Sequence, residues 1–225
     1  MSEENKKVYS PLKYKQIKVK EILLIPIHVD KNLNYEIFIH NGIIYSGQRY
    51  GKTKKYEDPD MSDIAVEFYE ILYGIKILNE NNGIEFPGYA GDTMNSYKSV
   101  AKFALEDKRQ EWYLRYHCLA NFWLYPYKKT RRESKYPGRV SCNDSLDAYL
   151  SLHEVNIDQH YLSGYNPLWR GTKAEIKNHQ NQYKNQADMV INKMIECIEL
   201  RADNIVRDEK VCNELYDFFK EKKLL

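Results

Sequence analysis

The sequence predicts an α+β fold in which a small N-terminal antiparallel sheet precedes a mostly helical domain. Two observations support this prediction. β-prone runs are concentrated in the first fifty residues, and apolar residues at helical spacing recur from Ile64 to the carboxyl end. Strands first and helices afterwards is typical of α+β folds, whereas alternating strands and helices would indicate a parallel sheet.

At 225 residues the chain is long enough to bury a core without disulfides or metals. We expect one domain over residues 1–225, with a β-rich part at 1–60 and a mainly helical part at 61–225. The formal net charge of +2 does not by itself indicate a nucleic-acid partner. Four widely spaced cysteines and the lack of a signal peptide or membrane-spanning run favour a cytoplasmic protein without a membrane partner. The abundance of Lys, Asn, Ile and Tyr is typical of an AT-rich bacterial or phage genome.

The predicted sheet consists of β-prone runs at residues 16–28, 35–40 and 43–46. Asn41-Gly42 separates the last two runs. Both central residues of a type I′ turn need positive φ, which Asn and Gly adopt readily. The sequence therefore predicts a hairpin here, within a small antiparallel sheet.

Apolar residues at i, i+3 and i+4 spacing predict the helices. The clearest helix contains Ile64 to Leu78, is opened by Ser62 and Asp63, and is closed by Asn81-Asn82-Gly83. The other expected elements are helices from Thr93, over 109–120, near 144–153 and from about 173, two C-terminal helices containing Ile191 to Ile205 and Val211 to Phe219, a buried strand at 121–125, and a loop at 128–142.

Residues 46–53 resemble a phosphate-binding loop, with Gly51-Lys52-Thr53 following a predicted strand. That loop needs four residues between its glycines so that successive amides surround the phosphate, and a helix must follow it. Three residues separate Gly47 from Gly51, and residues 54–59 are a poor helix start. A basic turn is therefore the favoured interpretation.

Asp92 is the candidate metal ligand. With Glu106-Asp107-Lys108 it matches the order of acids and lysine in metal-dependent nucleases, where carboxylates hold Mg²⁺. The simpler interpretations are that Asp92 caps the following helix and that residues 106–108 form a solvated helix end. In the enzymatic alternative Asp92 holds a divalent metal, and Asn95 and Asn121 support the same pocket.

The histidines and cysteines give weaker signals. His153 and His160 are seven residues apart, whereas zinc on one helical face needs i, i+4 spacing, so a half-buried histidine is favoured over a ligand at His153. His117 and Cys118 are adjacent and point to different helical faces, which argues against a nucleophile and its base within that segment.

A cation-rich segment that contains tyrosines is the candidate nucleic-acid surface. Its proposed contact residues are Tyr127, Lys128, Lys129, Arg131, Arg132, Lys135 and Arg139. Cations can meet phosphates while neighbouring rings stack on bases. The alternative is a solvated loop whose charge is offset elsewhere, which the near-zero net charge favours. A second cationic segment, with Arg49, Lys52, Lys54 and Lys55, would favour nucleic acid if both segments share a face.

Residues 85–96, 119–126 and 144–149 resemble an uncharacterised bacterial family, a domain of unknown function. Its members carry a Gly-Asp-Thr-Met-Asn-Ser-like loop and a Gly-Asn-Phe-x-x-Leu-Pro-like strand, and this chain has Ala120 at the strand's glycine. The resemblance implies no activity. Residues 119–126 are also distantly similar to the HNH-like domain of restriction endonucleases, but the metal-site histidine of those enzymes has no convincing counterpart just upstream.

The sequence thus favours a nucleic-acid- or nucleotide-binding protein, in phage defence or a mobile element. Its binding face would form where the 91–96 and 128–139 loops converge. One alternative is a protein-interaction module or homodimer without catalysis, in which exposed Trp123 and Trp169 are hot spots. The other is a metal-dependent nuclease, so a binding protein and an enzyme both remain open.

Overall fold

The computed structural model describes residues 9–47, 58–77, 88–92, 98–126, 157–164, 178 and 181–225. Within these ranges the fold is α+β, as predicted, with a three-stranded sheet near the N-terminus and helices in most of the remainder. No helix in the described ranges combines the length and the apolar composition needed to cross a bilayer.

Helix α1, Pro11–Leu23, occupies most of the region where a strand was predicted, and that prediction was wrong. The Ser10 Oγ accepts a hydrogen bond from the Lys13 N–H, and proline at the first helical position sacrifices no helical hydrogen bond. Val19, Ile22 and Leu23 are buried, at the i, i+3 and i+4 spacing of one helical face. The β-branched residues suggested a strand, but the spacing of the buried ones is helical.

The sheet contains β1 (Ile27–Val29), β2 (Ile37–His40) and β3 (Ile43–Ser46), in the order β1-β3-β2. The predicted hairpin is confirmed, because β2 and β3 are antiparallel and Asn41 and Gly42 have φ of 51° and 72°. The sheet is mixed rather than antiparallel, since β1 pairs with β3 in parallel. The connection from β1 carries the chain past the position of β3 to the far edge, so β3 returns in the direction of β1.

The end of β3 anchors the sheet to helix α2, Asp63–Tyr73. The buried Ser46 hydroxyl donates to the Asp63 carboxylate, and the Asp63 N–H donates to the Gly47 carbonyl at 3.3 Å. Gly47 has no room for a side chain, because a Cβ there would lie 2.2 Å from the backbone nitrogen of Tyr35. The connection between β1 and β2 therefore crosses directly against the end of β3.

Helix α2 begins where the sequence predicted, with the Ser62 Oγ accepting from the Ala65 N–H at 3.4 Å. It ends at Gly74, whose φ of 61° suits glycine, and so stops well before the predicted end at 81–83. Residues 81–83 lie outside the described ranges. A 3-10 turn, η1 (Pro59–Met61), precedes the helix.

The middle of the chain contains α3 (Lys98–Ala101), α4 (Glu106–Tyr116), η3 (Leu119–Asn121) and the antiparallel strands β4 (Gly88–Asp92) and β5 (Phe122–Pro126). The predicted buried strand at 121–125 corresponds to β5. The helix predicted at 109–120 starts earlier and ends earlier, as α4. Glu106 to Lys108 form its first turn, with Lys108 in an ion pair with Glu111 at 2.8 Å, as expected for a solvated helix end.

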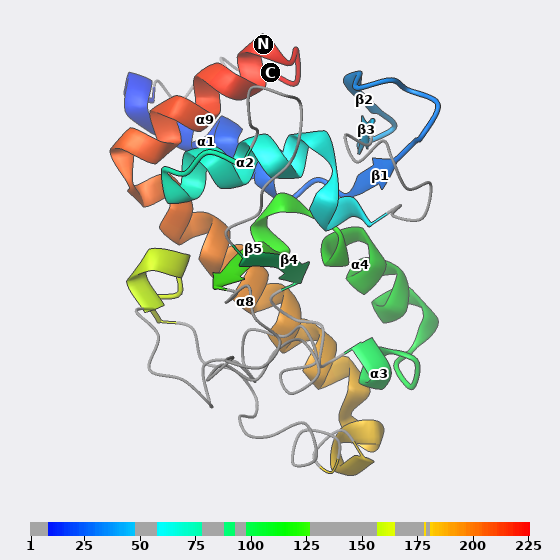
Figure 1. The fold of residues 1–225 in the computed structure, drawn as a ribbon. Coiled ribbons are helices and arrows are strands. Elements are labelled where there is room, and N and C mark those ends of the chain that lie inside the picture. The colour runs from blue at the N-terminus through cyan, green and yellow to red at the C-terminus, as the bar shows by residue number, and fades with distance from the viewer. Residues whose placement is uncertain are drawn as a thin grey trace, which may run out of the picture.

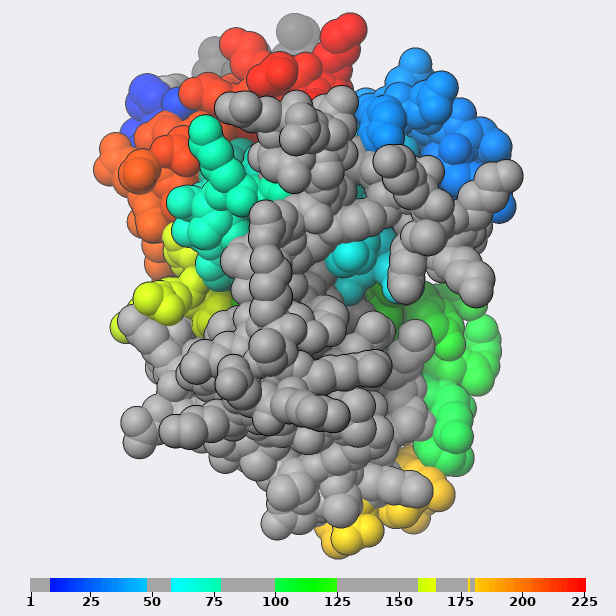
Figure 2. Space-filling view, in the orientation of Figure 1, coloured from blue at the N-terminus to red at the C-terminus, as the bar shows by residue number. Residues whose placement is uncertain are grey.

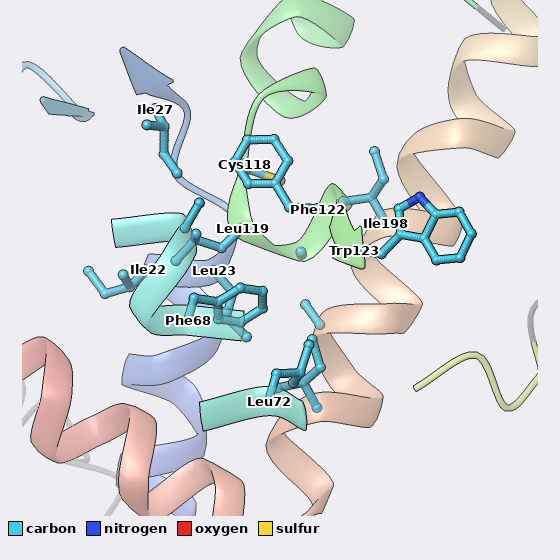
Figure 3. Close-up of a cluster of buried hydrophobic side chains, with 14 of the residues drawn as sticks. Ile22, Leu23, Ile27, Phe68, Leu72, Cys118, Leu119, Phe122, Trp123 and Ile198 are labelled. Atoms are coloured by element: carbon cyan, nitrogen blue, oxygen red, sulfur yellow. The ribbon is translucent and has the colours of Figure 1, made fainter. Parts of the chain in front are cut away.

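The last third contains η4 (Ile157–His160), η5 (Tyr183–Gln186), α8 (Ala187–Arg207) and α9 (Glu209–Glu221), which confirms the two predicted C-terminal helices. Helix α8 runs through the molecule, with α1 and α9 packed together near one end and α4 alongside (Figure 1). The core in Figure 3 collects side chains from several elements, including Leu23, Phe68, Phe122 and Ile198. The helix predicted near 144–153 lies outside the described ranges, as does the start, near residue 173, of the polar helix predicted before α8.

Candidate functional site

Most of the site residues predicted from the sequence lie outside the described ranges. They are Asn95, Tyr127, Lys128, Lys129, Arg131, Arg132, Lys135 and Arg139, together with Arg49, Lys52, Lys54 and Lys55 of the second cationic segment. Their roles remain predictions.

The backbones of Asp92 and Asn121 lie close together, because Asp92 pairs with Phe122, the residue after Asn121, across β4 and β5. Asp92 is the last residue of β4; its side chain lies outside the description. Asn121 is fully buried, and its Nδ2 donates to the Tyr116 carbonyl at 2.6 Å. The Asn121 amide therefore has a structural role at the end of α4.

The register of β4 and β5 determines where the two predicted loops leave this ladder. Asp92 pairs with Phe122 at one end, and Gly88 pairs with Pro126 at the other. The chain after Asp92 and the chain after Pro126 therefore depart from opposite ends, about 13 Å apart for strands of this length. This register gives no support to a pocket formed where the two loops begin.

Metal and nucleophile chemistry finds no support among the described residues. Within those ranges, no group of three or more His, Cys, Asp or Glu side chains could hold a metal ion. The described cysteines, Cys118, Cys197 and Cys212, are buried, and none of them is in a disulfide. Trp123 is 1% exposed, so the hypothesis that it is an exposed hot spot is wrong, and Trp169 lies outside the described ranges.

A buried arginine, which the sequence analysis did not single out, joins three segments at the centre of the molecule. Arg201 of α8 is 1% exposed. Its Nη1 donates to the carbonyls of Ala120 at 2.8 Å and Phe122 at 2.6 Å, and its Nε donates to the His160 carbonyl at 2.9 Å. Among the described residues, no carboxylate forms an ion pair with it. Backbone carbonyls therefore solvate this cation, and the cation in turn holds the start of β5 and η4 against α8.

Tyr73 and His160 complete this buried polar centre. The Tyr73 hydroxyl accepts from Arg201 Nη2 and from the Leu124 N–H, both at 3.4 Å, and lies 3.2 Å from His160 Nδ1. Burial, and to a smaller extent the Arg201 cation, lower the pKa of His160 to about 4. The imidazole is therefore neutral at pH 7, and its Nδ1 can accept a hydrogen bond from the Tyr73 hydroxyl. Burial also raises the pKa of Tyr73 above its usual value. Arg201 and the Tyr73 hydroxyl thus bond to groups inside the protein, and the arrangement acts as a structural joint.

Four aromatic rings gather on the outer face of the N-terminal sheet. We call His28, Phe38, His40 and Tyr45 the ring face. His28, Tyr45 and Phe38 are paired directly across the three strands, so they form one row. The Tyr45 ring centroid lies 5.4 Å from that of His28, 5.2 Å from that of Phe38 and 6.4 Å from that of His40. Phe38 and Tyr45 are nearly parallel, at 11°.

The ring face is solvent-exposed because the alternation of the strands directs the other set of residues to the core. Ile27 and Ile44 are buried, whereas His28, Phe38 and His40 are exposed and Tyr45 is half-buried. In Figure 2 the sheet residues, in lighter blue, stand at one corner of the molecule. The alternating rings at residues 38, 40 and 45 are a signal in the sequence that could have identified this face.

A surface hollow of about 400 Å³ lies between the segment that joins α3 to α4, the turn η5 and the start of α8. Its lining includes Phe103, Leu105, Lys184 and Asp188. The Lys184 ammonium lies 5.2 Å from the centre of the Phe103 ring, and the Asp188 carboxylate accepts from the Leu105 N–H at 2.9 Å. Both charged groups therefore have interactions within the fold, and the ring face remains the stronger candidate.

No family model, curated protein or solved structure matches this chain.

Proposed function

We propose that the protein binds single-stranded nucleic acid and that bases stack on the ring face of the N-terminal sheet. The observation that carries this proposal is the row formed by His28, Tyr45 and Phe38 across the three strands. Rings on an open sheet offer π surfaces to unpaired bases, whereas bases inside a duplex are already stacked on one another. The proposed ligand is therefore a single strand.

The sequence also suggests which residues bind the phosphates of the strand, namely those of the two cation-rich segments. Arg49, Lys52, Lys54 and Lys55 follow β3 closely along the chain, and Arg131 and Arg132 belong to the second segment. Lysine and arginine bind phosphates and release counterions, which makes the binding sensitive to salt. A cytoplasmic protein of phage defence or a mobile element is the setting in which we place this activity.

The direct test is fluorescence anisotropy with a labelled single-stranded oligonucleotide and the duplex of the same sequence. We expect Tyr45→Thr to weaken single-strand binding about tenfold or more, because stacking contributes roughly 1–3 kcal/mol per base. Tyr45 lies in the central strand, so this variant leaves the edge strand β2 in place. Tyr113→Thr is the matched control, since Tyr113 is 54% exposed on α4.

Equal affinity of Tyr45→Thr, Tyr113→Thr and the unmodified protein would exclude the ring face as the binding surface. Arg131→Glu with Arg132→Glu tests the cationic segment separately. We expect this double variant to weaken binding at low salt and to reduce the salt dependence of the dissociation constant. Unchanged retention at low salt would remove these arginines from the proposal.

A further inference from the structure

Strand β2 lies at an edge of the N-terminal sheet with half of its backbone groups directed outward. The Gly47 N–H donates to the Glu36 carbonyl, whereas the Ile44 N–H donates to the Pro26 carbonyl, on the side of β1. Residues 36, 38 and 40 of this antiparallel pair therefore bond toward β3, and Ile37 and Ile39 direct their N–H and carbonyl groups away from it. No other described strand pairs with this edge.

Strand β2 is short, but it lacks three features that often prevent pairing at a sheet edge. The sequence Ile-Phe-Ile-His contains no lysine, no proline and no bulge. Ile39 belongs to the core-facing row of Ile27 and Ile44, which are 4% and 0% exposed, yet Ile39 is 36% exposed. The apolar layer beneath the sheet therefore continues to the edge, where its last side chain, Ile39, is exposed.

The residues around Phe38 are complementary to themselves when read in the opposite direction. An antiparallel pairing centred on Phe38 places Ile37 opposite Ile39 of the partner subunit and Glu36 opposite His40 of the partner subunit. Ile37 and Ile39 are the residues with outward N–H and carbonyl groups, so both pairs would exchange hydrogen bonds. The Glu36 carboxylate would accept from an imidazole N–H on the same face.

We infer that two copies of this chain associate through their β2 edges about a two-fold axis at Phe38, joining two sheets into one continuous sheet. A pairing of this kind closes on itself, because each copy presents the same surface to the other. Phe38 and the partner subunit's Phe38 become neighbours on the outer face, so the two ring faces form one uninterrupted row. The inference rests on the strand edge and holds whether or not nucleic acid is bound.

Sedimentation velocity of the full chain over a range of concentrations tests this association. We expect a monomer–dimer equilibrium, and we expect Ile39→Lys to raise its dissociation constant at least about tenfold, because each dimer carries two charges at the apolar edge. Leu105→Lys is the control, since Leu105 is 65% exposed and lies outside the sheet. Circular dichroism confirms that both variants are folded. A wild-type chain that remains monomeric to about 1 mM would overturn the inference.

Two further variants test the register. Glu36→Lys should weaken the dimer several-fold, and adding His40→Glu should restore it, because residue 36 meets residue 40 of the other copy at both ends of the pairing. Phe38→Cys, in a Cys142→Ser background, should form a disulfide-linked dimer on mild oxidation, whereas Tyr113→Cys should not. The described native cysteines are buried and do not compete. Failure of the double variant to restore association, or equal cross-linking at both positions, would reject this register.

Discussion

The N-terminal sheet and the centre of the helical region differ in the environment of their polar and aromatic groups, which are exposed on the sheet and buried in the helical region. Arg201 donates four hydrogen bonds to acceptors inside the protein, and the surrounding rings of Tyr73, Trp123 and His160 are packed edge to face. On the sheet, the rings face solvent and the β2 edge leaves backbone groups directed outward.

This difference distinguishes a region whose contacts stabilise the fold from a region whose surface is suited to binding a ligand or a partner. Buried polar groups contribute to stability when they are hydrogen-bonded. Removing one of them leaves its partners buried without a hydrogen bond, which costs the full desolvation penalty of those partners. Exposed rings contribute little to stability, so their concentration on one face needs another reason. We therefore expect substitutions in the two regions to have different effects on the free energy of unfolding.

Arg201→Met should produce the largest effect. The substitution preserves much of the side-chain volume but removes the donors to three buried carbonyls, and we expect it to lower the free energy of unfolding by roughly 4 kcal/mol. Arg207→Met is the matched control, because Arg207 lies on the same helix and is exposed. Urea denaturation at pH 7 measures both variants. A loss below about 1 kcal/mol for Arg201→Met would show that the buried joint is not the stabilising centre.

Acid should produce the next largest effect, through His160. Its pKa is about 4 in the folded protein and near 6.5 when unfolded, so the unfolded state binds a proton first as the pH falls. Above pH 6.5 His160 is neutral in both states and does not make the free energy of unfolding depend on pH. Between pH 6.5 and 4, protonation of the unfolded state lowers the free energy of unfolding by about 3 kcal/mol. We expect His160→Gln to show a flatter dependence of unfolding free energy on pH in that window. The same slope in both proteins would assign the acid sensitivity to other groups.

Phe38→Thr should have the smallest effect on stability. Phe38 is 38% exposed on an edge strand, and threonine retains the preference for extended backbone, so we expect a change below about 1 kcal/mol. Thermal denaturation at concentrations where the chain is monomeric isolates this change from self-association. A loss comparable to that of Arg201→Met would mean that the ring face is part of the stabilising core, which would abolish the contrast between the two regions.

The elements that the sequence predicted well are those whose signals are local. Asn41-Gly42 specifies the hairpin through its own backbone preferences, and Ser62 marks the start of α2 by capping it. The stripe of apolar residues along α8 likewise requires no knowledge of its partners. Helix α1 was missed because its β-branched residues outweighed the capping signal of Ser10-Pro11.

The candidate sites were harder to predict because they depend on which distant segments meet. Arg201 lies on the buried stripe of α8, three residues after Ile198, and a cation at that position is a signal that could have been recognised. Its acceptors at Ala120, Phe122 and His160 come from segments far away in the sequence. The row of rings requires the strand order β1-β3-β2. The hairpin pairs Tyr45 with Phe38, whereas the pairing of Tyr45 with His28 depends on β1 lying on the other side of β3.

Gly47 has a consequence for recognising relatives of this protein. A single added carbon at this position would collide with the backbone of Tyr35, whatever the chemistry of the new residue. We therefore expect distant homologues in which the β1–β2 connection lies equally close to the end of β3 to have glycine at this position, even where the neighbouring residues differ. A glycine directly after the second strand of the hairpin is therefore a feature that we expect such homologues to share.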